Sequence, residues 1–264
     1  MTPEEISANR RKYIEKEAHF GEISKSPHTK YACAEDVAAM LDESQFDRAV
    51  IFGFAFNDPG LCRMVNDYVI EKTGQYSDKL TGFISAPPNA KCAEKEIDRC
   101  LSAGLRGVGE IFHIDNEKES LALAAICIER DLPLIIHVNE PVGHYYPGKI
   151  SIELKRIEQF IEKNQKLCVV LAHWGGGLIL YEAMPEIRVK FSNVYYDTAA
   201  TPFLYDESIY RAAMALGLSH KIVFGSDYPL LSPRRYMNAL NSLPLADQNA
   251  ILDDNARRLL KIRD

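Results

Sequence analysis

The chain has 264 residues, of which 47% are apolar and 26% charged, and its formal net charge is −6. This length fits one α/β barrel, while the scattered Lys and Arg residues argue against a nucleic-acid partner. No apolar stretch approaches the ~20 residues that span a bilayer, and the polar N-terminus lacks a signal-peptide core. We therefore expect a cytoplasmic protein without membrane contact, whose six cysteines are free thiols.

From about residue 46 onward, a short apolar run, a loop and an amphipathic helical pattern alternate along the chain. The runs at 48–54, 80–85, 107–111, 134–138, 169–172, 194–197 and 222–225 are rich in β-branched residues and predict strands. Such alternation predicts parallel strands joined by right-handed crossovers. Residues 1–17 are charged and helix-patterned, so they predict no strand.

Seven predicted strands are one fewer than a closed (β/α)₈ barrel requires. The alternative is an open doubly wound sheet, which usually carries a glycine-rich phosphate turn after its first strand. The first strand here is followed by AFNDPG, which has no such pattern. We therefore predict a single α/β domain over residues 1–264, a TIM-barrel-like fold that is distorted or incomplete.

Ionisable residues stand where the predicted strands end. They are Glu110, His137, His173, Asp197 and Asp227, each about one strand–helix unit from the next. In this fold class such side chains converge on one mouth, where active sites lie. Imidazole and carboxylate groups suit zinc and similar ions, and such an ion lowers the pKa of bound water to ~7. An Asp beside that water takes its proton.

Each of these residues also has a structural alternative. A single His at the end of an apolar strand is often a hydrogen-bonded core residue, although two on successive strands favour function. Glu110 is either a ligand or an ion-pair partner, and Asp197 is equally suited to cap the following segment.

Two loops carry candidate substrate-binding residues. His144, Tyr146 and Lys149 lie in VNEPVGHYYPGK after His137, and Trp174 precedes three glycines after His173. We expect these side chains to contact a small-molecule substrate. The alternatives are a solvated loop and a plain tight turn.

The segments LIIHVNEPVGHYYPGK, LAHWGGGL, VYYDTAA, FGSDYPLLSP and ILDDNARRLL resemble the amidohydrolase-related group of the metal-dependent amidohydrolase superfamily. The resemblance covers nearly the whole chain. It implies a distorted TIM barrel with one or two divalent metals, often zinc. It also implies hydrolysis of amides, esters or lactones, or non-oxidative decarboxylation of aromatic acids.

The same resemblance assigns roles residue by residue. It makes His137 a metal ligand and His173 a second ligand or a substrate-polarising residue. Asp227 becomes a ligand and proton shuttle, and Glu110 stands where a bridging ligand occurs in two-metal members.

The family's first strand, which ends in H-x-H and supplies two metal ligands, has no counterpart here. A mis-assigned start, a trimmed chain and a natural variant are three explanations. Because only His137, His173 and Asp227 would remain as ligands, weak or absent metal binding is expected. Unpaired edges at the gap would be filled, bridged by water or used for self-association into a homo-oligomer.

Three functions follow from these observations. The first is a metal-dependent hydrolase acting on a small molecule, and the second is a decarboxylase of the same family. The third is a catalytically silent relative that binds a metabolite or a protein partner. Metal analysis of the purified chain separates the first two from the third.

Overall fold

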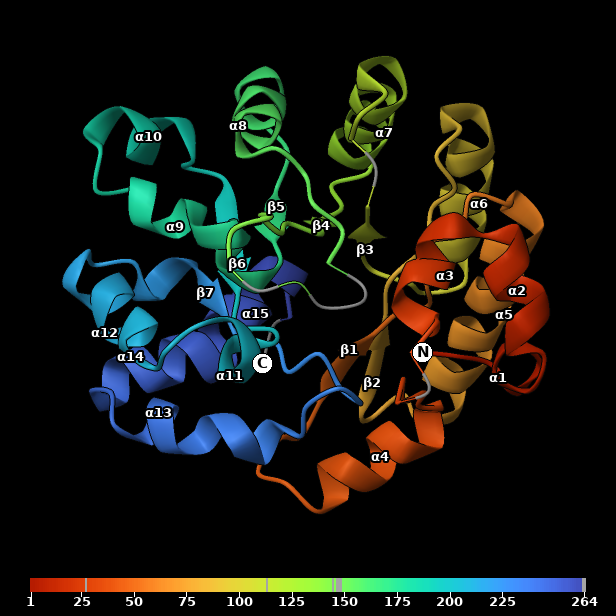
Figure 1. Ribbon diagram of the computed structural model, residues 1–264, viewed down its shortest axis with the longest axis horizontal. Coiled ribbons are helices and arrows are strands. Elements are labelled where there is room, and N and C mark those ends of the chain that lie inside the picture. Colours follow the sequence, from red (N-terminus) through yellow and green to blue (C-terminus); the bar gives the residue numbers. More distant parts are fainter. Residues whose placement is uncertain (27, 113, 144, 146–148, 263–264) are drawn as a thin grey trace.

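The computed structural model describes residues 1–26, 28–112, 114–143, 145 and 149–262. Short parallel strands alternate with helices, and the helices lie around the strands (Figure 1). All the strands fall inside the runs that the sequence predicts, which confirms their positions and order. They are β1 (Ala49–Ile51), β2 (Leu80–Gly82), β3 (Val108–Ile111), β4 (Leu134–Ile136), β5 (Val169–Leu171), β6 (Val194–Asp197) and β7 (Ile222–Val223).

The helices divide into an N-terminal group and the crossovers. The first group is α1 (Glu4–Ala8), α2 (Arg10–Lys16), α3 (Ala18–Ser24) and α4 (Ala34–Asp42). The next are α5 (Pro59–Gln75), α6 (Ala90–Ser102), α7 (Glu117–Glu129), α8 (Leu154–Lys163), α9 (Leu178–Tyr181), α10 (Pro185–Lys190), α11 (Thr201–Leu204) and α12 (Ser208–Ala215). The chain ends with α13 (Met237–Asn241), α14 (Leu245–Asn249) and α15 (Asn255–Leu260). None of the helices described is both long and apolar enough to cross a membrane.

Short helical turns complete the fold. Three of them are 3₁₀ turns, η1 (His173–Gly177), η2 (Ser219–Lys221) and η3 (Pro233–Tyr236), and η4 (Ala250–Asp254) is a π-helical turn. Local sequence explains where three long crossover helices begin. Asp58, Asn89 and Asn116 each accept a hydrogen bond from a first-turn N–H of α5, α6 and α7. Asp and Asn favour this capping position because their side chains satisfy an otherwise unpaired backbone donor.

The strands form an open barrel. β1 pairs with β2, and β3 to β7 pair in chain order, all in parallel. Backbone bonds connect the two parts, since Ile84 N donates to Gly107 O at 2.8 Å and Arg106 N donates to Gly82 O at 2.9 Å. No pairing between β1 and β7 occurs in the described part of the chain. The predicted incomplete TIM-barrel-like architecture is thus confirmed.

Side chains and loops occupy the open side between β1 and β7. The rings of Phe46 and Phe224 stack with centroids 4.7 Å apart, and Phe224 N donates to Ile251 O at 3.0 Å. The amino group of Met1 donates to Phe52 O, beside β1. The described residues among the first 30 form helices and no strand, as predicted. Self-association stays a prediction.

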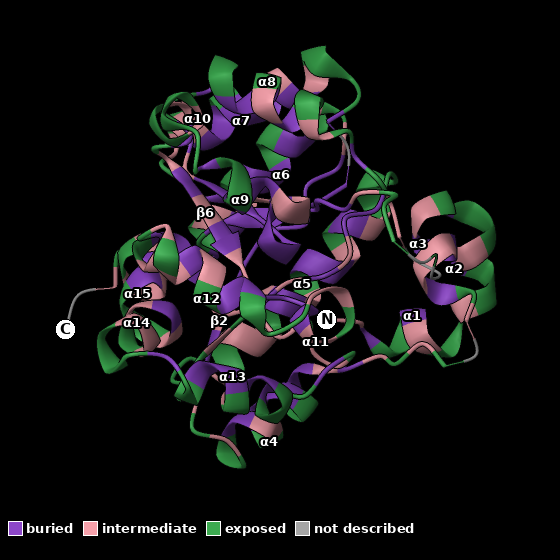
Figure 2. Cartoon of the chain, turned by 60° about the vertical axis from the view of Figure 1, so that its left-hand side comes forward, coloured by how far each residue is buried: buried purple, intermediate pink, exposed green. Residues whose placement is uncertain are grey.

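Helices bury their inner faces against the strands and expose their outer faces (Figure 2). In α8, the predicted apolar face is confirmed, because Ile157, Phe160 and Ile161 are buried while Lys155 and Glu162 are exposed. The six cysteines are free, and burial raises the pKa of three thiols to about 12, which keeps them protonated. Those three are Cys62, Cys100 and Cys127.

A buried ion pair connects the segment after α9 with the start of β7. Lys221 Nζ donates to both carboxylate oxygens of Glu182, at 2.6 and 2.7 Å, and to Phe191 O at 2.7 Å. Tyr196 donates its hydroxyl to Glu182 at 2.8 Å, and Glu182 is fully buried. Removing one partner of such a pair leaves the other charge uncompensated in the core.

We therefore expect Lys221→Met to lower the free energy of unfolding by about 3–5 kcal/mol in urea denaturation. Lys163→Met is the matched control, because Lys163 pairs with Glu117 at the surface, and we expect a loss of about 0–1 kcal/mol. Equal losses in the two variants would contradict the structural role of the buried pair.

Candidate metal centre and active site

Three of the sequence-predicted residues meet at the carboxyl ends of neighbouring strands. Glu110 belongs to β3, His137 directly follows β4, and His173 begins η1 after β5. Glu110 Oε1 lies 2.7 Å from His137 Nδ1 and 3.8 Å from His173 Nε2. The two imidazole rings meet edge to face with centroids 5.0 Å apart, and both are buried. The strand-end spacing thus does bring these side chains to one point.

Backbone contacts fix the orientation of His173. Its Nδ1 donates to the carbonyl oxygen of Ala199 at 3.1 Å, which sets the tautomer and leaves Nε2 facing Glu110. This is the arrangement in which an outer hydrogen bond orients a metal-binding imidazole. His173 and Trp174 have φ angles of 58° and 59°, the left-handed region that non-glycine residues rarely occupy. Such strained backbone clusters at functional sites.

Asp197, at the end of β6, holds two loops together. Its Oδ1 accepts from His173 N at 2.8 Å and from Ala199 N at 2.9 Å. The capping alternative from the sequence describes these contacts only in part, because one bond comes from His173 and the N-cap of α11 is Ala200. Burial, the largest influence, raises the pKa of Asp197 to about 6 against the opposing effect of His173. Asp197 thus positions both the backbone and the ring contact of His173.

The pKa values of the central group are set by opposing effects. Burial by itself would raise the pKa of Glu110, but the charges of His137 and His173 and the His137 hydrogen bond hold it below its ordinary value. Burial would lower the pKa of His173, but Glu110, Asp197 and Asp227 raise it overall. The group therefore favours an ionised carboxylate facing imidazoles.

Asp227 follows β7 and borders the same group. Asp227 is exposed as a whole residue, while neighbouring protein atoms crowd the water around its carboxylate. This crowding is the largest influence and raises its pKa, against the opposing charges of His173 and His137. Its φ of 60° is left-handed, and Tyr236 holds the preceding residue by donating to Ser226 O at 2.8 Å. Asp227 is thus exposed and lies close enough to the group for the charges of His173 and His137 to influence its carboxylate.

The central group suits a divalent metal. One potential ligand atom from each of Glu110, His137 and His173 lies within 4.8 Å of the others. Two imidazoles and one carboxylate are the three protein ligands of many catalytic zinc sites, and they also bind other first-row metals. In addition, His137 Nε2 is buried and has no hydrogen-bond partner among the described residues. These residues could therefore hold one divalent ion, with Asp227 beside them rather than among them.

The candidate substrate-binding residues lie apart from this group or outside the described residues. Trp174 is fully buried, with Nε1 donating to Thr201 Oγ1 at 2.8 Å. Lys149 Nζ donates to Val142 O at 2.6 Å in its own loop. His144 and Tyr146 fall outside the described residues. Contact of these four with substrate stays a prediction.

The structure adds aromatic residues that the sequence interpretation passed over. Phe112 follows β3, and its ring centroid lies 5.0 Å from those of His137 and Phe54. His19 of α3 meets Phe112 at 6.4 Å. The sequence could have indicated Phe112 as a residue near the site, because it stands two positions after Glu110 at the end of a predicted strand. The sequence could not indicate that α3 packs near Phe112, because that contact joins segments far apart in the chain.

Comparison with known proteins identifies the family. The model of the amidohydrolase family matches residues 15–262. The chain belongs to this family. The resemblance of the strand-end motifs is thereby confirmed. A search of curated proteins found no match.

Solved structures share the fold of this amidohydrolase-family chain at low sequence identity. A 5-carboxyvanillate decarboxylase from Novosphingobium aromaticivorans, with manganese and a nitrobenzoic acid, has a TM-score of 0.77 at 17% identity, covering 98% of this chain and 93% of its own. A dihydroxybenzoic acid decarboxylase from Polaromonas, with manganese and 2-nitroresorcinol, has a TM-score of 0.73 at 16% identity. The match covers 99% of this chain and 95% of the decarboxylase. A 4-oxalomesaconate hydratase from Rhodopseudomonas palustris has a TM-score of 0.64 at 13% identity. The match covers 98% of this chain and 92% of the hydratase.

Proposed function

We propose that this chain is a divalent-metal-dependent enzyme that decarboxylates a small aromatic acid without redox chemistry. The observation that carries the proposal is the group of Glu110, His137 and His173 with Asp227 beside it. Two of the structures described above are decarboxylases that hold manganese and aromatic compounds, which supports this reaction over the family's other chemistries.

Glu110, His137 and His173 would hold the ion, and Asp197 and Ala199 keep His173 in orientation. When bound, the ion would neutralise and orient an anionic substrate group. The sequence favours zinc and the structural relatives favour manganese, and this donor set accepts both. The rings of Phe112 and Phe54 offer aromatic surface beside His137.

Asp227 would supply the proton that the reaction needs. In decarboxylation, the bond from the ring carbon to the carboxylate breaks, its electron pair stays on the carbon, and CO₂ leaves. The carbon then takes a proton, which Asp227 donates and regains from water. A raised pKa favours the protonated carboxyl group that such a donor requires.

Hydrolysis of an amide, ester or lactone is the second candidate. Two imidazoles and a carboxylate form the ligand set of several hydrolytic zinc enzymes, and the family model is that of amidohydrolases. In this reaction Asp227 would accept a proton from the attacking water instead of donating one to carbon.

One assay separates the candidates. The purified chain is stripped with chelator, reloaded with Mn²⁺ or Zn²⁺, and incubated with hydroxybenzoates and with neutral amides, esters and lactones. Metal-dependent CO₂ release supports decarboxylation, whereas ¹⁸O incorporation from labelled water into a cleaved acid supports hydrolysis. A chain that binds neither metal and converts no compound would instead support the catalytically silent relative.

A further inference from the structure

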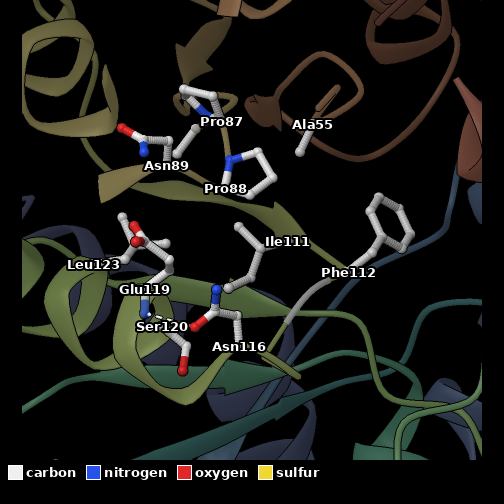
Figure 3. Close-up of a pocket in the computed structure, with 11 residues that line it drawn as sticks. Ala55, Pro87, Pro88, Asn89, Ile111, Phe112, Asn116, Glu119, Ser120 and Leu123 are labelled. Carbon is white, nitrogen blue, oxygen red and sulfur yellow. Dashed lines mark hydrogen bonds between the residues drawn. The ribbon is translucent and has the colours of Figure 1, made fainter. Parts of the chain in front are cut away.

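A separate pocket of about 280 Å³ opens beside the metal group, between the loops that follow β2 and β3 and the start of α7 (Figure 3). Ile111, which directly follows Glu110 in β3, lines this pocket. Phe112 lines it too and contacts the ring of His137. The pocket therefore adjoins the proposed active site at the carboxyl end of β3.

The pocket combines an apolar surface with a polar edge. Pro87 and Pro88 lie opposite Ile111, and Leu123 of α7 extends the apolar surface (Figure 3). A cavity of ~150 Å³ lined by apolar side chains holds a benzene molecule. A volume of about 280 Å³ therefore accommodates one substituted ring.

Hydrogen-bonding groups at the edge are partly committed to the helices. Asn89 Oδ1 accepts from Cys92 N at 3.2 Å, and Asn116 Oδ1 accepts from Glu119 N at 3.4 Å. Within the described part of the chain these bonds use only the Oδ1 atoms, so each amide has its NH₂ group to offer a ligand. Glu119 Oε2 accepts from Ala90 N at 2.7 Å, so its carboxylate is fixed at the pocket.

The charge at the pocket selects against anions. Glu119 is the one charged side chain among the described lining residues, and none of them is Lys or Arg. An anionic ligand would meet this carboxylate without a compensating cation, and like charges brought together in a partly buried site repel. A hydroxyl group, by contrast, donates to a carboxylate and accepts from an amide.

We propose that this pocket binds a neutral, single-ring molecule that carries a hydroxyl group, a ligand of the phenol class. The metal group would attract a carboxylate, so the two neighbouring sites have opposite charge preferences. A phenol is also what the proposed decarboxylation of a hydroxybenzoate would release. The binding claim itself rests on the pocket alone and stands without that reaction.

The test uses chelator-treated protein, which removes metal-dependent binding of carboxylates. Phenol and benzoate are titrated into methyl-labelled protein by NMR. We expect contacts from phenol to the methyl groups of Leu123 and Ile111, and roughly tenfold weaker binding of benzoate. Absence of those contacts, or equal binding of the two ligands there, would overturn the proposal.

Three variants sharpen the result. Ala86→Leu places bulk in the pocket and should weaken phenol binding roughly tenfold, whereas Ala183→Leu, at an exposed position outside it, should change nothing. Glu119→Gln keeps an acceptor for Ala90 N and should reduce the preference for phenol over benzoate. An unchanged preference in Glu119→Gln would overturn the charge argument. If Ala86→Leu fails to fold, the wild-type methyl contacts decide.

Discussion

His137→Ala should lower the affinity of the chain for Mn²⁺ and Zn²⁺ by about 100-fold or more, measured by calorimetric titration of chelator-stripped protein. Changes to groups that merely support metal ligands cost ~10–100-fold, and His137 is itself one of three candidate ligands. The variant also removes the hydrogen-bond partner of Glu110, which should raise the pKa of that carboxylate and further weaken metal binding.

His220→Ala is the matched control, because His220 is exposed and lies outside the group. Circular dichroism and urea denaturation of both variants separate metal loss from unfolding, since an unpaired Glu110 would cost ~1–3 kcal/mol. A wild-type chain that binds neither ion, or equal affinities in His137→Ala and wild type, would contradict the metal centre.

The expectation of weak metal binding came from the missing H-x-H motif, which left His137, His173 and Asp227 as ligands. The structure groups Glu110 with the two histidines instead, and places Asp227 beside them. Sequence spacing showed that these residues share one end of the barrel. It did not show which carboxylate lies between the imidazoles, because that depends on the register of β3 against β4.

The fold was readable because its signals are local. β-branched runs mark the strands, and helices such as α8 carry an apolar stripe at helical spacing. The length of each strand was less accurate: β7 spans two residues where the sequence predicted four. The remaining residues of each β-branched run continue as loop. A strand ends where its hydrogen bonds to a neighbouring strand end, and composition does not show that point.

The contacts that support the site could not be predicted from the sequence, because they join loops that follow different strands. Asp197 reaches the backbone of His173, and Trp174 is enclosed by Thr201 and Tyr210. The sequence placed Trp174 at the right loop and could not show that its ring is buried. The pocket beside β3 is likewise lined by residues of separate segments, such as Pro87 and Leu123.

Asp227→Asn should lower kcat by about 10²–10⁴, the usual contribution of a positioned proton-transfer group. The change removes the ionisable proton but preserves shape, and Asn tolerates the left-handed conformation that Asp227 adopts with φ of 60°. KM and the melting temperature should change little, because Asp227 lies outside the group of three candidate ligands. The measurement is steady-state kinetics on the compound that the wild-type chain converts.

Asp131→Asn provides an unusually close control for this experiment. Asp131 also has a left-handed backbone, with φ of 54°, but it is exposed at the end of α7, before β4 and away from the strand ends that carry the site. The same chemical change in the same conformation should leave kcat unaltered there. If Asp227→Asn retained wild-type kcat, Asp227 would not be the proton donor. If Asp131→Asn also lost activity, the effect of Asp227→Asn could not be assigned to proton transfer, because carboxylates remote from the site would matter equally.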